Sequence, residues 1–178
     1  MTDTPEIDSV LTEAELAQVI EELADRLAPQ LKGEWTIVSI LIGAMPFTTD
    51  LMKALARRDI HPILDALWLE SYKDARESSG RVVVRADISR PIKGRGVLIL
   101  DDVFDTGRTL AFAKTHMLAK GAREVITCAL ARKPIAPKDG VDVYGFKAPG
   151  RFLVGYGMDD AGKYRGLPYL GALDVEKA

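Results

Sequence analysis

Cysteine is nearly absent from the 178 residues, and histidine is almost as rare. The single cysteine, Cys128, cannot form a disulfide within the chain, which is typical of proteins from a reducing compartment. It lies in the apolar run EVITCALA, so we expect a buried, unreactive thiol. His61 and His116 each stand alone, without a second metal-ligating side chain at a suitable spacing, and we expect surface or interface positions for both.

Long apolar runs are also missing. No stretch reaches the roughly 20 apolar residues that a membrane helix needs, and the acidic start MTDTPEIDSV does not resemble a secretory signal. We therefore expect a cytoplasmic protein without a membrane partner. The net charge of −2 argues against a dedicated nucleic-acid binder. The motifs GxxxxGK[ST] and GxGxxG are absent as well, which argues against P-loop and Rossmann nucleotide sites.

Helical and strand patterns alternate along the chain, with no repeat or long linker, and one domain is expected over residues 1–178. Helices are predicted at 12–28, 47–57 and 109–120, and strands at 35–43, 62–70, 81–86, 97–103, 124–131, 141–146 and 152–157. Thr12 and Glu15 form a capping box, and Gly121 is a natural left-handed helix cap. The alternation predicts an α/β fold with a mostly parallel, twisted sheet flanked by helices. The polar segment SYKDARESSG, residues 71–80, is predicted to be a mobile loop.

The stretch VLILDDVFDTGRTL, residues 97–110, takes a buried strand into a cluster of negative charge. Asp101 and Asp102 fall where the strand leaves the sheet, and ligands of parallel sheets bind beyond that end. Two neighbouring carboxylates repel each other unless a cation or hydroxyl donors accept them. A ribose beside a divalent cation provides both.

The same stretch then enters a turn suited to a phosphate. Gly107 permits a tight turn, the hydroxyls of Thr106 and Thr109 can donate, and the N-terminus of the next helix attracts an anion. The simpler alternative is a surface turn with a capped helix. The buried strand and the acidic pair favour the first interpretation, a site for a phosphorylated ribose.

With these residues the sequence resembles the type I phosphoribosyltransferases, and within them the hypoxanthine (hypoxanthine-guanine) phosphoribosyltransferases. The likeness continues in the family's order through SILIGAMPFTTDL (39–51), SY (71–72), ARKP (131–134) and FLVGYGMDDAGKYRGLPYLGAL (152–173). The last segment is the most specific to enzymes acting on 6-oxopurines. The resemblance implies a small hood formed by the terminal segments, beside the sheet, and assembly into a homodimer or homotetramer.

The resemblance also implies a reaction. N9 of hypoxanthine or guanine would displace pyrophosphate from phosphoribosyl pyrophosphate, giving the nucleoside monophosphate IMP or GMP in purine salvage. Mg²⁺ is the implied cofactor, as a Lewis acid on the departing pyrophosphate. Which of hypoxanthine, guanine or xanthine is preferred stays open. The alternatives are a phosphoribosyltransferase for another base and an RNA-binding regulator on the same fold, which would need a basic surface.

Matching positions assign roles residue by residue. Asp105 matches the acid/base carboxylate that exchanges a proton with purine N7, Lys133 the donor to the 6-oxo group, and Phe152 the ring that stacks on the base. The implied sets are Asp101, Asp102, Asp105, Thr106, Gly107, Arg108 and Thr109 for the ribose and 5′-phosphate; Lys133, Arg151, Phe152, Leu153 and Asp159 for the purine; Gly43, Ala44 and Arg165 for pyrophosphate; Asp101, Asp102 and Asp159 for the metal; and Ser71 and Tyr72 for a lid at 71–80.

Simpler explanations exist for these residues when each is taken alone. Phe152 could be a core aromatic residue, and Lys133 could be a solvated residue at a strand end. Asp159 and Arg165 could form a surface ion pair. Two positions depart from the family pattern. Ile42 stands where the family often has lysine, which leaves only backbone amides for pyrophosphate, and the strained peptide bond often found there is not assumed. Asp160 replaces a common tyrosine, without a reason that the sequence shows.

Overall fold

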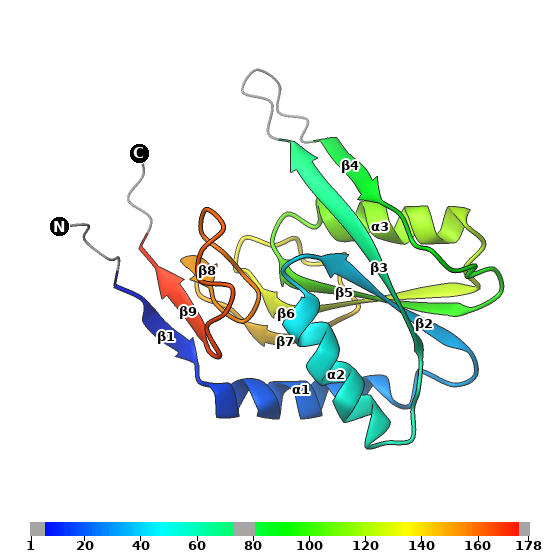
Figure 1. Cartoon of the computed structure of the whole chain (residues 1–178), viewed down its shortest axis with the longest axis horizontal. Helices are drawn as coiled ribbons and strands as arrows, with labels where there is room; N and C mark the ends of the chain where they lie inside the picture. The colour runs from blue at the N-terminus through cyan, green and yellow to red at the C-terminus, as the bar shows by residue number, and fades with distance from the viewer. Residues whose placement is uncertain (1–5, 73–80, 175–178) are drawn as a thin grey trace.

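A six-stranded sheet forms the centre of the protein (Figure 1), in a computed structural model that describes residues 6–72 and 81–174. Its strands, in spatial order, are β4 (Arg81–Ala86), β3 (Ile63–Tyr72), β2 (Trp35–Leu41), β5 (Gly96–Phe104), β6 (Glu124–Arg132) and β7 (Val143–Lys147). All neighbours run parallel except β4, which is antiparallel to β3. The predicted mostly parallel sheet is therefore confirmed.

Helices cover both faces of this sheet (Figure 1). One apolar cluster joins Leu98 and Leu100 of β5 to α1 (Glu13–Leu27) and α2 (Met45–Ala56), while a second joins Val97 and Ile99 to α3 (Arg108–Ala119). Because successive residues of a central strand thus enter different cores, β2 and β5 need apolar residues at nearly every position, as their sequences have.

A second, three-stranded sheet forms the hood. It consists of β1 (Asp8–Leu11), β9 (Leu170–Leu173) and β8 (Phe152–Val154), all antiparallel, so segments from the two ends of the chain lie side by side (Figure 1). The hood from terminal segments is confirmed. The strand patterns, however, missed β1 and β9, and the strand predicted at 152–157 is only three residues long and lies in the hood. Four-residue strands carry too little periodicity to be recognised without their partners.

Several local predictions are confirmed at the element ends. The amide of Glu15 donates to Thr12 Oγ1 at 3.3 Å while Thr12 N donates to the Glu15 carboxylate at 2.8 Å, which completes the capping box. Gly121 ends α3 with φ of 87°. The predicted loop begins later than expected, because β3 includes Ser71 and Tyr72, which pair with β4. The remainder of the predicted lid, residues 73–80, lies outside the described residues.

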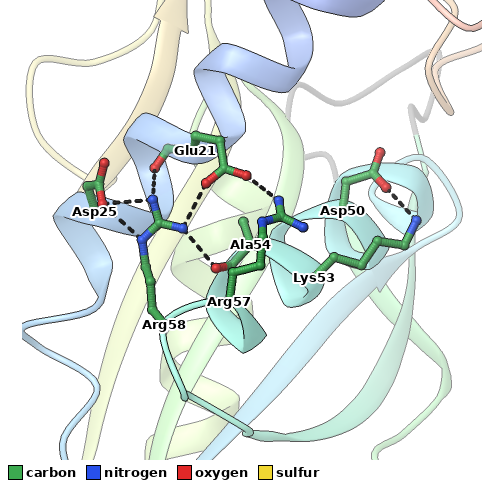
Figure 2. A network of polar contacts seen from close by, with 7 residues as sticks. All are labelled: Glu21, Asp25, Asp50, Lys53, Ala54, Arg57 and Arg58. Carbon is green, nitrogen blue, oxygen red and sulfur yellow. Dashed lines mark hydrogen bonds and ion pairs between the residues drawn. The ribbon is translucent and has the colours of Figure 1, made fainter.

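Charged side chains lock α1 against the C-terminal end of α2 (Figure 2). Arg58 donates to Glu21 at 2.8 Å and to the carbonyl of Ala54 at 2.8 Å, and it pairs with Asp25 at 2.7 Å. Arg57 also donates to Glu21. Single exposed pairs contribute little, but a network around one guanidinium holds two helices in a defined orientation.

The rare residues lie largely as expected. Cys128 is fully buried, and burial raises the pKa of its thiol to about 12, which confirms an unreactive core cysteine. His61 is exposed, and His116 contacts Asp87 at 3.0 Å and stacks on Phe112. Within residues 6–72 and 81–174, no helix is long and apolar enough to cross a membrane.

Candidate active site

The carboxyl end of β5 carries the two adjacent acidic residues. Asp101 is 7% exposed and Asp102 is partly buried, both still within the strand rather than beyond it. Asp102 N donates to Asp101 Oδ1 at 3.0 Å, and Val103 N donates to Asp102 Oδ1 at 2.8 Å. Burial raises the pKa of Asp101, and the charge of Asp102 raises it further. Burial also raises the pKa of Asp102, while hydrogen bonding with the Asp101 side chain and Val103 N and, to a smaller extent, the charge of Arg165 oppose that rise. The chain therefore holds two adjacent carboxyl groups where burial weakens the stabilisation of their charge by water.

The turn after β5 has the geometry expected for an anion. Gly107 is the N-cap of α3 with φ of 77°, and no side chain caps the first amides of the helix. The ring of Phe104 lies below the turn, 3.0 Å from the place where a β-carbon on Gly107 would stand. Asp105, Thr106 and Arg108 are exposed around it. A left-handed glycine and uncapped amides at a helix N-terminus form a cradle for a negative ligand.

Beside this turn is a cavity of about 270 Å³ that collects residues from distant parts of the chain. Its lining consists of Asp102, Val103, Asp105, Lys133, Phe152, Leu153, Met158 and Asp159. The residues predicted for the purine and for acid/base chemistry, apart from Arg151, thus meet in one space. Val103 and Met158 were not predicted, because each is an apolar residue next to an acidic one and its sequence pattern is that of an ordinary core position.

Lys133 is fixed at this cavity by its backbone. It follows β6, and its amide donates to the carbonyl of Phe104 at 3.0 Å, which ties it to the end of β5. Its ammonium group donates to the carbonyl of Arg151. Burial lowers the pKa of Lys133, and the charge of Asp105 opposes that effect. The alternative of a fully solvated strand end is therefore wrong.

Phe152 and Arg151 lie at the edge of the hood, and their side chains have different surroundings. Phe152 is 43% exposed and lines the cavity, so it is not the core aromatic of the alternative explanation. Arg151 pairs instead with Asp8 at 2.7 Å and Asp174 at 2.6 Å, which are contacts within the hood and its end. The carbonyl of Arg151 accepts from the Lys133 ammonium group, and the predicted place of Arg151 in the purine set stays a prediction.

The loop between β2 and α2 closes the site on the side of Asp102. The Leu41–Ile42 peptide bond is cis, although the sequence alone did not justify that expectation. A β-carbon on Gly43 would stand 1.8 Å from Asp102 Oδ2, so only glycine permits this approach. Ala44 is buried at the N-cap of α2, whereas Ile42 is 43% exposed.

Arg165 and Asp159 come from the long segment between β8 and β9. Arg165 pairs with Asp159 at 2.6 Å and donates to the carbonyl of Gly157 at 2.6 Å, while the other oxygen of Asp159 accepts from Gly162 N at 2.7 Å. This pair is partly buried, and its Asp159 lines the cavity. Asp160 is exposed in a turn closed with Lys163, and the structure shows no reason for an aspartate there.

Comparison with known proteins adds a decisive observation. The family model described as "Phosphoribosyl transferase domain" matches residues 6–161. The chain belongs to this family. Among relatives, hypoxanthine-guanine phosphoribosyltransferase from Bacillus subtilis is 33% identical and covers 94% of each chain. The enzyme of the same name from Mycobacterium tuberculosis H37Rv is 35% identical, over 95% of this chain and 87% of its own.

Other comparisons agree on the fold and raise a point about length. The structure of hypoxanthine-guanine phosphoribosyltransferase from Bacillus anthracis superposes with a TM-score of 0.86 at 31% identity, over 94% of this chain and 99% of that one. The bifunctional protein TilS/HprT from Listeria innocua is 37% identical over 94% of this chain, but the chain spans only 26% of its length. The type I phosphoribosyltransferase fold is therefore confirmed.

The side chains of this phosphoribosyltransferase could provide only part of the coordination of a Mg²⁺ ion. In the described part of the chain, no three His, Cys, Asp or Glu side chains gather to hold a metal ion by themselves. Mg²⁺ commonly takes one or two carboxylates together with substrate phosphates and water, and Asp101 with Asp102 provides such a pair of hard oxygen donors. Each oxygen of Asp159 already has one partner, Arg165 or the amide of Gly162, and keeps a further lone pair that could face a metal.

Replacing Asp101 with asparagine is expected to stabilise the ligand-free phosphoribosyltransferase. The change removes a buried charge that repels its neighbour, and the amide keeps an oxygen for Asp102 N. A gain of about 1 kcal/mol would raise Tm by about 2–4 °C for a chain of this size. Differential scanning calorimetry at pH 8 in EDTA measures the shift, with exposed Asp139→Asn as the matched control. A lower Tm for Asp101→Asn would contradict the expectation.

Proposed function

We propose that this phosphoribosyltransferase joins hypoxanthine or guanine to the 5-phosphoribosyl group of phosphoribosyl pyrophosphate, as a step of purine salvage. The bond from C1′ to the pyrophosphate oxygen breaks, and a bond from C1′ to purine N9 forms. The observation that carries the proposal is the cavity in which Asp105, Lys133 and Phe152 meet. A carboxylate, a cation and an exposed ring are the three groups that a 6-oxopurine with an exchangeable proton requires.

Each of the three groups has a role that its surroundings support. Phe152 offers a half-exposed ring face for stacking on the base. The Lys133 ammonium group, which donates to the Arg151 carbonyl in the free protein, is proposed to donate to the purine 6-oxo group instead. It disfavours adenine, whose 6-amino group is itself a donor. Asp105 takes the proton from purine N7 as the new bond develops.

The phosphate-bearing substrate is proposed to lie across the other side of the site. Amides at the start of α3 and the hydroxyls of Thr106 and Thr109 receive the 5′-phosphate, and Asp101 with Asp102 faces the ribose hydroxyls. Gly43, Ala44 and Arg165 face the pyrophosphate. When bound, Mg²⁺ supplies positive charge that stabilises the departing pyrophosphate, with Asp101 and Asp102 as its protein ligands.

Closure of the site by residues 71–80 stays a prediction. Ser71 and Tyr72 end β3 and pair with the edge strand β4, and the rest of the segment lies outside the described residues. We propose that it excludes water from the reacting ribose, since an oxocarbenium-like centre is open to hydrolysis. The single domain over residues 1–178 and the cytoplasmic location are likewise predictions.

A spectrophotometric assay tests the proposed function. Purified protein is mixed with phosphoribosyl pyrophosphate, Mg²⁺ and, in turn, hypoxanthine, guanine, xanthine, adenine, orotate and uracil. We expect nucleotide formation with hypoxanthine or guanine, and the relative rates show which is preferred. Activity only with adenine or a pyrimidine, or with no base at all, would overturn the proposal. Salt-sensitive RNA capture on a filter without nucleotide synthesis would favour the regulator instead.

We also propose that the chain assembles with a second copy through an apolar surface next to the pyrophosphate loop. Exposed large apolar side chains occur in this loop, in the first turn of α2 and on the neighbouring strands β3 and β4, namely Ile42, Met45, Leu64, Trp68 and Val83. Register places Leu41, the residue before Ile42, beside Trp68 of β3. A patch of this kind is typical of an interface.

The expected assembly is a homodimer or homotetramer. Light scattering coupled to gel filtration should therefore give a mass of two or four chains, against 19.5 kDa for one. Trp68→Glu places a charge in the proposed interface and is expected to give the single-chain mass, while Glu→Gln at exposed Glu22, on α1, leaves the mass unchanged. A single-chain mass for the unaltered protein would contradict assembly.

A further inference from the structure

The segment Gly155–Gly157 has an unusual backbone whose position needs an anchor. All three residues have positive φ, at 90°, 49° and 97°, and the central one is Tyr156 rather than glycine. A left-handed conformation costs an L-residue about 1–2 kcal/mol, so the surroundings must hold Tyr156 in place. Its side chain is 9% exposed, and its hydroxyl donates to Asp50 Oδ2 at 2.7 Å.

This hydrogen bond crosses from the hood side of the site to α2. Asp50 also pairs through its other oxygen with Lys53 at 3.0 Å on the same helix, as Figure 2 shows. Burial, followed by the bond to Asp50, raises the pKa of Tyr156, so its hydroxyl keeps its proton and donates. The network around Arg58 fixes α2 against α1 (Figure 2), which makes the helix a firm support.

Both ends of this connection reach the candidate active site. The helix α2 begins just after the loop 42–44, whose Gly43 lies against Asp102. On the other side, a β-carbon on Gly157 would stand 2.1 Å from the carbonyl oxygen of Gly43, so the two backbones are packed without space between them. The carbonyl of Gly157 accepts from Arg165, which in turn pairs with Asp159.

We propose that Tyr156 and Asp50 are positioning residues that set the distance between the loop 42–44 and the wall carrying Arg165 and Asp159. The inference rests on the proposed function of this site, because the residues assigned to pyrophosphate, Gly43, Ala44 and Arg165, lie on these two walls. Lys133, Phe152 and Asp105 do not depend on the connection, since they are held by β5, β6 and β8. The bond therefore tunes binding of the diphosphate-bearing substrate more strongly than purine binding, to which this wall contributes Asp159.

Tyr156→Phe is the direct test, because it removes only the hydroxyl oxygen and keeps the ring and an L-residue at the positive φ of position 156. We expect KM for phosphoribosyl pyrophosphate to rise roughly 5- to 10-fold, the size of one lost hydrogen bond, with KM for hypoxanthine within about 2-fold. Tm should change by less than about 4 °C. Asp50→Ala should reproduce the rise in KM. Asp50→Asn should partly retain the wild-type KM, because its amide oxygen still accepts a hydrogen bond. The double variant Tyr156→Phe with Asp50→Ala should have a KM for phosphoribosyl pyrophosphate no higher than that of either single variant.

The matched control is Tyr144→Phe, which removes a hydroxyl from β7, where the ring contacts Arg132. It should change neither KM. Equal rises in KM for both substrates, additive single effects, or an unchanged KM for phosphoribosyl pyrophosphate in Tyr156→Phe would overturn the inference. Titration of phosphoribosyl pyrophosphate into the protein in the presence of Mg²⁺, followed by calorimetry, separates the positioning role from the proposed function. If wild type lacks turnover the proposed function fails, whereas weaker binding by Tyr156→Phe and Asp50→Ala still supports the positioning role and unchanged binding rejects it.

Discussion

Replacing Asp105 with asparagine should lower kcat about 10²-fold or more. Asparagine keeps the size and most of the polarity of the side chain but cannot take a proton from purine N7. Asp105 is exposed and lines the cavity, and its side chain makes no hydrogen bond or ion pair within residues 6–72 and 81–174. The fold should therefore be unaffected, and steady-state kinetics with hypoxanthine measures the loss.

The control for this change is Asp139→Asn, which neutralises an exposed carboxylate away from the cavity lining. It should keep wild-type kcat. Circular dichroism and Tm of Asp105→Asn should match those of the wild type, so that lost turnover cannot be assigned to unfolding. If Asp105→Asn kept wild-type turnover, Asp105 would not be the acid/base residue, and the proton would have to leave through another group.

Lys133→Ala should remove the preference for 6-oxopurines. A charged hydrogen bond to the substrate contributes about 1.5–3 kcal/mol, so kcat/KM for hypoxanthine should fall roughly 10- to 10²-fold. Adenine should gain relative to hypoxanthine, because the cation that opposes its 6-amino group is gone. The measurement is the ratio of kcat/KM between the two bases.

Lys138→Ala is the matched control, since it removes an exposed lysine a few residues further along the same loop. It should leave the ratio of the two bases unchanged. An unchanged ratio in Lys133→Ala would assign base selection elsewhere, to backbone groups around Leu153, which also line the cavity.

The parts of the fold that follow from local chemistry were predictable. The capping box at Thr12, the left-handed Gly121 and the continuous apolar runs of β2 and β5 depend on neighbours in the chain, and all are present. The acidic pair and the turn at Gly107 were predictable for the same reason, because strand, turn and helix start are consecutive. Predictions that failed involve partners far apart in sequence, such as the short strands of the hood, whose pairing joins residue 8 to residue 172.

The candidate site shows the same division. Arg151 stands next to Phe152, and only the hood decides that the arginine faces Asp8 while the phenyl ring faces the cavity. The need for glycine at position 43 depends on Asp102, which comes from another strand. Likewise, Tyr156 has an ordinary appearance in the sequence, and its bond to Asp50 exists only because α2 and the segment after β8 meet in space.

By itself, then, the order of residues determined the type of each long element, the buried strand that ends in paired carboxylates, and the glycine turn that begins a helix. Those features arise from propensity, periodicity and capping, which act over a few residues. Tertiary structure alone decided which side chains share the cavity, which glycines permit close backbone contact, and which arginine is used elsewhere. Such outcomes depend on packing between segments many residues apart, and a linear pattern does not contain those distances.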